Sequence, residues 1–317
     1  MAGSPRCARA LLVALAVGAA ACTASSTTDV VPTSDQTTVA PTPTADAVPT
    51  PTADALPCPD LALGRPFATV ADPALTEISG AVASPTTPDR VWVHEDSGTA
   101  PVLHQLTLGG ATEATWQLDG VDAVDWEDIA ALPSPPALLV GDIGDNRRVR
   151  TSVVVHRLAE PATSGTGPPD ATIELRLPTP TNAEALLVDP RSGDLVVVTK
   201  DLAGDAEVLV AAGVALADDG TVHTMEVAGT LSLGLLAPVL AGDVAPDGHA
   251  VALRTPSDVL WWTVGDDESL ADALLGRDPC RLPSTVDVYG EALAILSAPA
   301  GYLLLGEGTN PAMPVAR

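Results

Sequence analysis

The region from residue 58 to residue 317 predicts an all-β fold, and three observations support this prediction. Short apolar or alternating runs recur along it, and Gly, Pro, Asp and Asn cluster between them, as in proteins built from short strands and turns. A single stretch, ESLADALLG (268 to 276), has the pattern of an amphipathic helix. A motif that begins with an acidic residue and runs into small and aliphatic residues also repeats. Its five copies lie in EISGAVASP, DWEDIAALP, NAEALLVDP, LAGDVAPDG and YGEALAILS.

The repeat has the period of a propeller blade. Its acidic markers lie 48 to 59 residues apart, which fits a unit of four strands with long loops. The markers are Glu77, Glu127, Glu184, Asp243 and Glu291. The sequence therefore predicts a five-bladed β-propeller, with six blades as the alternative if one long interval contains two.

Each blade is assigned its strands in chain order. Blade one takes residues 78–84, 90–95, 101–108 and 111–117, and blade two takes 126–132, 137–143, 151–158 and 171–177. Blade three takes 184–188, 194–200, 206–213 and 223–231, and blade four takes 242–246, 249–254, 258–264 and 281–287. Blade five has only 291–296 and 301–306. We therefore expect an N-terminal strand at 66–70 to supply its outer strand and close the ring.

Residues 1–21 are expected to form a signal peptide. Two arginines precede an apolar run that is too short to cross a bilayer, and three alanines favour cleavage before Cys22. Small residues followed by Cys after an apolar run resemble the lipobox of bacterial lipoproteins. We therefore expect a lipid on Cys22, which would hold the protein on the extracytoplasmic face of the cell membrane; the alternative is ordinary secretion.

Residues 22–57 are expected to form a tether between Cys22 and the propeller domain at 58–317. The segment contains few large apolar side chains and carries PTPTADA twice, so it cannot bury enough surface to offset its chain entropy. Its Thr, Ser and Pro content is also compatible with O-glycosylation.

The remaining cysteines, Cys58 and Cys280, are expected to form a disulfide. After cleavage they are the only cysteines besides Cys22, in a compartment where thiols oxidise. The alternative is two buried free thiols. A bridge that closes so long a loop would stabilise the fold by at most somewhat more than about 4 kcal/mol in the chain-entropy model.

The charge balance excludes one class of partner. The formal net charge is −26, and Lys and Arg number only 15. Nucleic acids and anionic surfaces are bound through clustered cations, so we expect no nucleic-acid partner. We expect a monomer.

Antiparallel pairing of the first two strands should gather acidic residues around the channel mouth, because the start of the first strand faces the end of the second. In this ring we expect Glu77 to meet His94, Glu95 and Asp96, and Asp125, Glu127 and Asp128 to meet Asp142, Asp145 and Asn146. We expect Glu184 to meet Lys200 and Asp201, Asp243 to meet Arg254, and Glu291 to meet Glu307.

Several of these motifs, taken together, resemble a family of secreted bacterial β-propellers. They are EISGAVASP, VWVHEDSG, DWEDIAAL, LLVGDIGDN, NAEALLVDP, AGDVAPDGHAVALRT and GEALAIL, which cover most of 77–307. The resemblance implies a distant similarity to phytase-like and esterase-like propellers. The family has Asn where this chain has Glu95, which puts in doubt any role that needs an amide there.

Two kinds of site follow from the ring. Its densest carboxylates could bind Ca²⁺, which prefers oxygen ligands, or could simply cap turns. The candidate metal ligands are Glu127, Asp128, Asp142, Asp145 and Asn146. The other ring residues are candidates for ligand binding: Glu77, Glu184, Lys200, Asp243, Arg254 and Glu291. Lys200 and Arg254 could neutralise Glu184 and Asp243, or could receive an anionic group.

Catalysis is the alternative to binding. His94 beside Asp96 could act as a general base for phosphoester or ester hydrolysis, with a metal-bound water; otherwise His94 is a packed strand-end residue. The GxSxG, HExxH, CxxC and Walker motifs are absent from the sequence. We therefore expect a surface-anchored propeller that binds a ligand or partner protein at an acidic, Ca²⁺-dependent mouth, with a metal-dependent hydrolase as the alternative.

Overall fold

The computed structural model describes residues 57–66, 68–96, 98, 100–285, 290–298 and 300–317. These residues belong to one compact unit. The expected signal peptide, Cys22 and nearly all of the expected tether lie outside the described residues. Within the described part of the chain, no helix has the length and apolar character needed to span a membrane.

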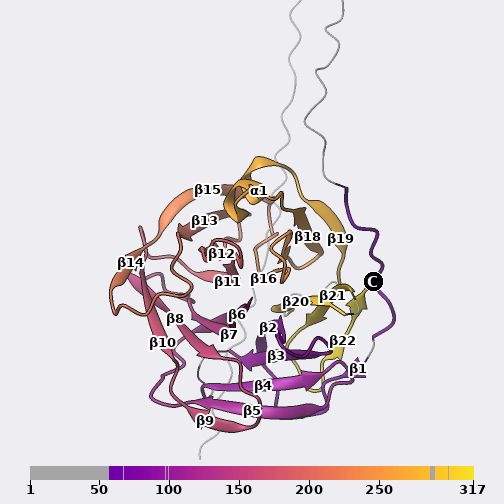
Figure 1. Ribbon diagram of the computed structural model, residues 1–317. Helices are drawn as coiled ribbons and strands as arrows, with labels where there is room; N and C mark the ends of the chain where they lie inside the picture. The colour runs from indigo at the N-terminus through magenta and orange to yellow at the C-terminus, as the bar shows by residue number, and fades with distance from the viewer. Residues whose placement is uncertain (1–56, 67, 97, 99, 286–289, 299) are drawn as a thin grey trace, which may run out of the picture. The chain divides into compact units, whose positions relative to one another are not determined.

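Five β-sheets form a ring, as predicted, and the innermost strands surround its centre (Figure 1). Blade one contains β2 (Ile78–Ala83), β3 (Arg90–Glu95), β4 (Val102–Thr107) and β5 (Thr112–Leu118). Blade two contains β6 (Trp126–Pro133), β7 (Pro136–Asp142), β8 (Ser152–Ala159) and β10 (Ala171–Arg176). Blade three contains β11 (Ala183–Val188), β12 (Leu195–Thr199), β13 (Asp205–Ala211) and β15 (Glu226–Ser232). Blade four contains β16 (Ala241–Val244), β17 (Ala250–Arg254), β18 (Asp258–Thr263) and β19 (Cys280–Pro283).

Blade five closes the ring by combining both ends of the described chain. Its strands β20 (Ala292–Ser297) and β21 (Ala300–Leu305) are followed by β23 (Val315–Ala316). Leu63 pairs with Ala316, and the backbones of Ala62 and Gly64 hydrogen bond to Arg317 and Val315. An N-terminal segment therefore supplies the outer strand, but its residues are 62–64 instead of the expected 66–70. The later residues form β1 (Ala68–Thr69), which pairs with β22 (Ala312–Met313) in a separate small sheet.

The Cys58–Cys280 disulfide explains why the closing strand begins so early. The two Cα atoms lie 5.7 Å apart, and Cys280 begins β19 of blade four. Since the bridge holds Cys58 on blade four, the residues that directly follow it reach the free edge of β23 first. The predicted disulfide is confirmed.

The connections between the third and fourth strands cover the outer edges of preceding blades. From blade two, β9 (Gly165–Gly167) adds to β5 of blade one, and from blade three, β14 (Val222–Thr224) adds to β10 of blade two. The corresponding connection of blade four contains α1 (Leu270–Gly276), which contacts β15 of blade three. The predicted helix is confirmed. These additions protect strand edges that would otherwise be open to pairing with another chain.

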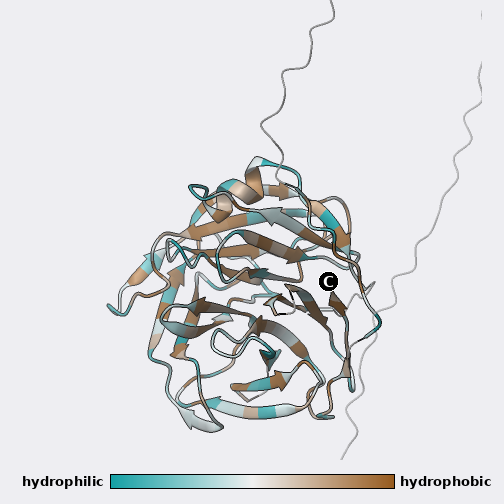
Figure 2. Cartoon of the chain, turned by 45° about the vertical axis from the view of Figure 1, so that its right-hand side comes forward, coloured by the Kyte–Doolittle hydropathy of each residue, from teal (hydrophilic) through white to brown (hydrophobic). Residues whose placement is uncertain are grey.

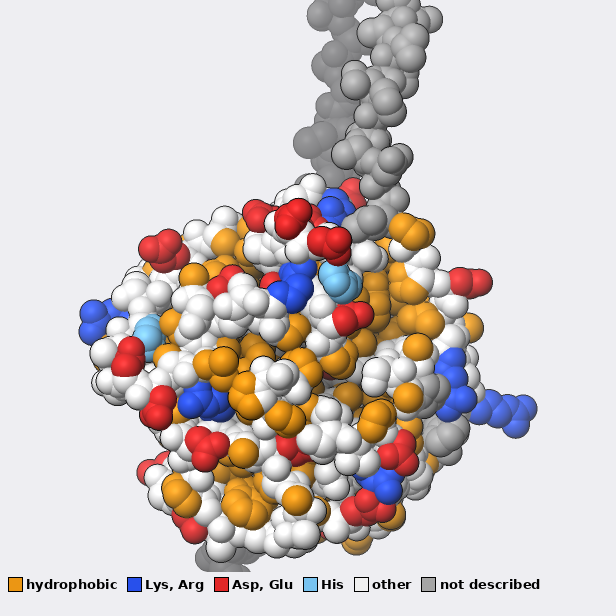
Figure 3. Space-filling model, in the orientation of Figure 1, with side chains coloured by type: hydrophobic (Ala, Val, Ile, Leu, Met, Phe, Trp, Pro, Cys, Tyr) orange, Lys and Arg blue, Asp and Glu red, His pale blue; other side chains and the backbone are white. Residues whose placement is uncertain are grey.

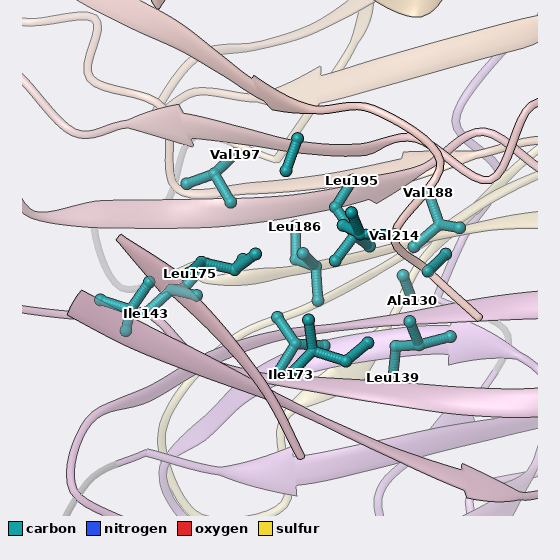
Figure 4. Close-up of a cluster of buried hydrophobic side chains, with 14 of the residues drawn as sticks. Ala130, Leu139, Ile143, Ile173, Leu175, Leu186, Val188, Leu195, Val197 and Val214 are labelled. Carbon is teal, nitrogen blue, oxygen red and sulfur yellow. The ribbon is translucent and has the colours of Figure 1, made fainter. Parts of the chain in front are cut away.

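Apolar side chains fill the space between neighbouring blades. Hydrophobic residues lie mainly along the strands, and hydrophilic residues lie mainly in the connections (Figure 2). Between blades two and three, Leu139 and Ile173 pack in one buried cluster with Leu186 and Val197 (Figure 4). This packing fixes the radial position of each inner strand, and therefore the position of the side chains at the channel mouth.

Candidate functional site

Three inner strands begin with a β-bulge at the channel mouth. The pairing register shifts between Ile78 and Gly80 in β2, between Trp126 and Asp128 in β6, and between Ala183 and Ala185 in β11. The residues at these shifts are Ser79, Glu127 and Glu184. A bulge adds one residue to a strand and redirects its side chain. It therefore separates the environment of Glu127 from that of the next residue, Asp128.

Asp96, Asp125 and Glu127 come together in a cluster that we call the acidic triad. Each offers a carboxylate oxygen, and these oxygens all lie within 4.8 Å of one another. Asp96 directly follows β3, Asp125 directly precedes β6, and Glu127 lies in β6. The triad thus joins blades one and two at the mouth.

Gly144, the second glycine of GDIGDN, leaves room for the triad. A Cβ atom at this position would lie 2.2 Å from Oε1 of Glu127 and 2.6 Å from Oδ2 of Asp125. Both distances are far below van der Waals contact, so a larger residue would displace the carboxylates. Packing against these carboxylates therefore explains why residue 144 is a glycine, which the composition of the loop alone does not reveal.

Burial, followed by repulsion between like charges, determines the electrostatics of the triad. Burial raises the pKa of Glu127 well above its ordinary value, and the carboxylates of Glu184, Asp96 and Asp125 raise this pKa further. A buried carboxylate among like charges favours either a proton or a bound cation.

Lys200 occupies the other side of the mouth. Its Nζ lies 3.0 Å from Oε1 of Glu184 and 3.6 Å from Oε1 of Glu291, so it links blade three to blade five. Asn182 also donates a hydrogen bond of 2.8 Å to Oε1 of Glu184. We call Glu184, Lys200 and Glu291 the Lys200 bridge. The expected contact of Glu184 with Lys200 is present.

The carboxylates around the Lys200 bridge have raised pKa values. Burial raises the pKa of Glu184 to about 7, although Lys200 opposes this shift. Burial, followed by repulsion from Glu291, raises the pKa of Glu307 to about 7, and burial raises the pKa of Glu291 as well. The mouth therefore contains carboxyl groups that titrate near neutral pH.

The GDIGDN loop is held by hydrogen bonds of its own. Oδ1 of Asp142 accepts from Nη1 of Arg150 at 2.6 Å, and Oδ2 accepts from the backbone N–H of Val124 at 3.0 Å. Oδ2 of Asp145 accepts from the backbone N–H groups of Val149 and Arg150. Asn146 is exposed. The structure thus divides the predicted metal set, since Glu127 alone among its members lies in the acidic triad.

Asp128, a fourth member of that set, lies inside the ring. Its carboxylate accepts hydrogen bonds from the backbone N–H groups of Ile129, Leu186 and Gly242 at 2.9, 2.9 and 3.3 Å. It thereby connects blades two, three and four. Burial raises its pKa well above the ordinary value, although the three donors oppose this shift. Asp128 is a structural residue of the channel interior.

Asp243 has a similar role between blades four and five. Its carboxylate accepts from the backbone N–H groups of Val244 at 2.8 Å and Ile295 at 2.7 Å, and burial raises its pKa to about 8. The strand register does not place Arg254 opposite Asp243 as expected, because Asp243 pairs with Ala252 and Arg254 pairs with Ala241. Asp243 therefore lies deeper in the channel than its place in the repeat predicts.

Arg254 connects blade four to blade five through backbone carbonyls. Nη1 donates to the carbonyl oxygens of Ala292 and Leu305, and Nη2 donates to Oγ1 of Thr285. A Cβ atom at Gly290 would lie 2.0 Å from Nη2, so this glycine makes room for the guanidinium.

His94 and Asp96, the predicted catalytic pair, lie in different environments. His94 is fully buried, its ring meets Trp126 edge-on with the centroids 5.5 Å apart, and burial lowers its pKa. A Cβ atom at Gly80 would lie 2.2 Å from Nε2 of His94, so the ring packs directly over the inner strand. Asp96 belongs to the acidic triad, whereas the enclosed position of His94 gives no support to a role as general base.

The first acidic position of blade one lies at the edge of the mouth. Glu77 is exposed, and the backbone N–H groups of Thr76 and Glu77 donate to Oε1 of Glu95 at 2.9 and 3.3 Å. Glu95 therefore holds the entry to β2. Because residue 95 is Glu, this chain has no side-chain amide at this position.

Two residues at the mouth were not assigned a binding role from the sequence. Asp125 belongs to the acidic triad, and Glu307 hydrogen bonds with Glu291. Both appear in the predicted ring of acidic residues. The signal that could have selected Asp125 is its place directly before the bulged Trp126–Asp128 segment.

Comparisons with known proteins add the following. No protein-family model matches the chain, and no curated protein matches its sequence. Among solved structures, U3-55K is 9% identical, with coverage of 78% of this chain and 98% of that chain and a TM-score of 0.42. Kuenenia stuttgartiensis hydrazine synthase is 10% identical, with coverage of 76% and 71% and a TM-score of 0.44. The WD40 repeats of RRP9 are 10% identical, with coverage of 81% and 100% and a TM-score of 0.42.

At these identities and TM-scores the neighbours indicate nothing about function. The five-bladed propeller rests on the five sheets of the chain itself. The functional argument must therefore come from the mouth.

Proposed function

We propose that this protein is a surface-anchored binding module whose channel mouth binds Ca²⁺ at Asp96, Asp125 and Glu127 and presents a ligand or partner site around the ion. The observation that carries the proposal is the approach of three carboxylates to within 4.8 Å. Three carboxylates supply between three and six oxygens, and water would complete the six to eight that Ca²⁺ takes.

The donor set favours Ca²⁺ over a transition metal. The triad offers oxygen atoms from carboxylates and no imidazole or thiolate, whereas zinc and copper sites rely on nitrogen and sulfur ligands. A bound cation would also relieve the repulsion that raises the pKa of Glu127. Binding should therefore weaken as the pH falls, because a proton competes with the ion.

The cation site can be tested directly on the purified full chain. We expect mass spectrometry to find one Ca²⁺ per chain, and Ca²⁺ to raise the melting temperature measured in EDTA. Asp125→Asn/Glu127→Gln should abolish both effects, while Glu77→Gln, at the exposed edge of the mouth, should preserve them. Absence of the ion from the wild type, with identical melting in EDTA and Ca²⁺, would contradict the proposal.

Anchoring through Cys22 is part of the proposal and is supported by the signal peptide and the small residues before this cysteine. We expect the expressed protein to fractionate with membranes and to incorporate labelled palmitate. Cys22→Ser should release it and remove the label. Unchanged membrane association and label in this variant would contradict anchoring at Cys22.

Partner choice follows from the charge of the molecule. On the face that Figure 3 shows, the Lys and Arg side chains of the described residues lie singly, mostly beside acidic ones. A surface of this kind supports binding of cations or cationic groups over nucleic acids.

Metal-dependent hydrolysis is the second candidate, because Glu184 and Glu307 have pKa values of about 7 near the triad. Groups with such values are suited to proton transfer at neutral pH. We expect Ca²⁺-dependent cleavage of bis(p-nitrophenyl) phosphate or p-nitrophenyl acetate, lost in Glu184→Gln, if this function holds. Equal rates in wild type and variant would contradict it.

A further inference from the structure

Large apolar side chains are exposed around the channel mouth. Among the described residues, those most exposed for their type on this face belong to loops that end or begin at the mouth: Val124 60%, Val149 68%, Leu202 66%, Leu235 78% and Leu236 69%. The remaining exposed large hydrophobic residues, Leu216, Val222 and Val227, lie elsewhere, in the connection from β13 to β15 and in β15 itself. Apolar side chains gathered on one face indicate an interaction surface more strongly than single scattered ones.

Three neighbouring loops bring four of these side chains to one side of the mouth. The backbone N–H of Leu236 donates to the carbonyl oxygen of Leu202 at 3.1 Å, which joins the loop after β15 to the loop after β12. Arg148 lies 3.5 Å from the carbonyl oxygen of Lys200 and 3.8 Å from Asp201, which joins the loop after β7 to the same region. We call Val149, Leu202, Leu235 and Leu236 the apolar rim.

The backbone conformation at Leu236 is an unfavourable one for leucine. Its φ angle is 63°, in the left-handed region that residues other than glycine rarely adopt. The loop nevertheless places a leucine there, 69% exposed, beside another leucine.

The apolar rim adjoins the charged part of the mouth. Leu202 follows Lys200 by two residues, and Nζ of Lys200 reaches Glu184 and Glu291 inside the mouth. Two arginines of the loop after β7 have acidic neighbours, since Arg148 lies near Asp201 and Arg150 binds Asp142. Apolar contacts outside and carboxylates inside would suit a partner that carries apolar and positively charged side chains together.

We propose that the apolar rim and the acidic mouth form a docking surface for a cationic amphipathic segment of a partner protein. Leu, Ile or Phe side chains of the segment pack on the rim, and its Lys or Arg side chains enter the mouth toward Glu291 and Glu307. The net charge of −26 supports a cationic partner and disfavours an anionic lipid surface. The surface goes beyond the proposed cation site, because it uses residues outside the acidic triad.

The experiment uses the full chain and a fluorescein-labelled peptide of 14 Leu and Lys residues in an amphipathic helical pattern. We expect fluorescence anisotropy to show saturable binding that weakens with added salt. Leu202→Ser/Leu235→Ser should weaken it about tenfold or more, since both leucines would bury apolar surface against the peptide. The matched control, Leu216→Ser/Val227→Ser, removes exposed apolar side chains outside the rim and should change the affinity less than about twofold.

Two further probes separate the sources of binding. A peptide of the same charge with Ser in place of Leu should bind weakly to every variant, because it lacks apolar contacts. Vesicles of phosphatidylglycerol and phosphatidylcholine should bind neither the wild-type rim nor the rim variant when both chains also carry Cys22→Ser, which removes the proposed lipid anchor. Rim-dependent binding to these vesicles, or equal peptide affinity for the wild type and the rim variant, would overturn the proposal.

Failure of this proposal differs from failure of the cation site. Leu202→Ser/Leu235→Ser should keep its Ca²⁺ content, because neither residue belongs to the acidic triad. Loss of peptide binding with unchanged Ca²⁺ content supports the docking surface on its own.

Discussion

Glu127 and Asp128 are adjacent in β6 and carry the same chemical group, yet they have different roles. The bulge places Glu127 at the mouth with Asp96 and Asp125, whereas Asp128 lies inside the ring and accepts three backbone hydrogen bonds from three strands. Burial raises the pKa of both groups. The difference teaches that the neighbours of a buried carboxylate, more than its burial, decide whether it serves structure or binding.

The largest expected effect comes from removing the interior carboxylate. Asp128→Ala leaves three buried N–H donors without their acceptor, so we expect the free energy of unfolding to fall by at least about 3 kcal/mol. Asp128→Asn keeps one accepting oxygen but places an NH₂ donor against at least one of these N–H groups, so it should lose less than Asp128→Ala, about 1 to 3 kcal/mol. Urea unfolding measures both, with the exposed Asp122→Ala as control. Equal stability of Asp128→Ala and wild type would contradict the structural role of Asp128.

The next effect comes from filling the space beside the acidic triad. Gly144→Ala places a methyl group against Glu127 and Asp125, so we expect a loss of about 1 to 3 kcal/mol in the free energy of unfolding. Ca²⁺ affinity should fall in parallel, measured by calorimetry. In Gly276→Ala the methyl group meets open space, and both quantities should stay near the wild-type values. Wild-type Ca²⁺ binding by Gly144→Ala would show that the triad is not the site.

The pH dependence should distinguish mouth from interior. The raised pKa values of Glu184, about 7, and Asp243, about 8, mean that the folded chain holds these protons more tightly than the unfolded chain. Their contribution to stability is complete below the ordinary carboxyl pKa and is lost as the pH rises through 7 and 8. Thermal melting in EDTA from pH 6 to pH 9 should show this decline. Glu184→Gln should remove its earlier part and Asp243→Asn its later part; unchanged profiles in both variants would contradict the assignment.

The smallest effect on stability is expected at the mouth itself. Glu127→Gln removes one of several like charges, so in EDTA we expect the free energy of unfolding to stay the same or to rise by up to about 1 kcal/mol. Thermal melting without metal measures this change. A large loss of stability would show that Glu127, like Asp128, is a structural residue.

Much of the fold follows from the sequence because the strand signals are local and repeat. Runs such as ALLVG and DLVVVTK have the apolar character of buried strands, and the acidic markers give the period of the blades. The strands β9 and β14, which add to the outer edges of preceding blades, were not predicted. Gly165–Gly167, which forms β9, has no strand pattern in the sequence and pairs only because the neighbouring blade offers an edge. The closing strand was predicted at residues 66–70 but lies at 62–64. Its position depends on the disulfide to Cys280, which is distant in the sequence.

The candidate site was predicted only in part, for a similar reason. Antiparallel pairing correctly gathered Glu184 with Lys200 and placed Asp96, Asp125 and Glu127 on one face. The sequence could not show which adjacent carboxylates a bulge turns apart, so Asp128 was grouped with Glu127. Nor could it show that Arg150 neutralises Asp142, since this contact depends on the path of the GDIGDN loop.

Isothermal titration calorimetry with Ca²⁺ on the full-length wild type, Glu127→Gln and Asp128→Asn tests the central claim most directly. We predict one site in the wild type, at least about tenfold weaker binding in Glu127→Gln, and near-wild-type binding in Asp128→Asn. Wild-type affinity in Glu127→Gln, together with loss of binding in Asp128→Asn, would place the ion inside the ring and contradict the account.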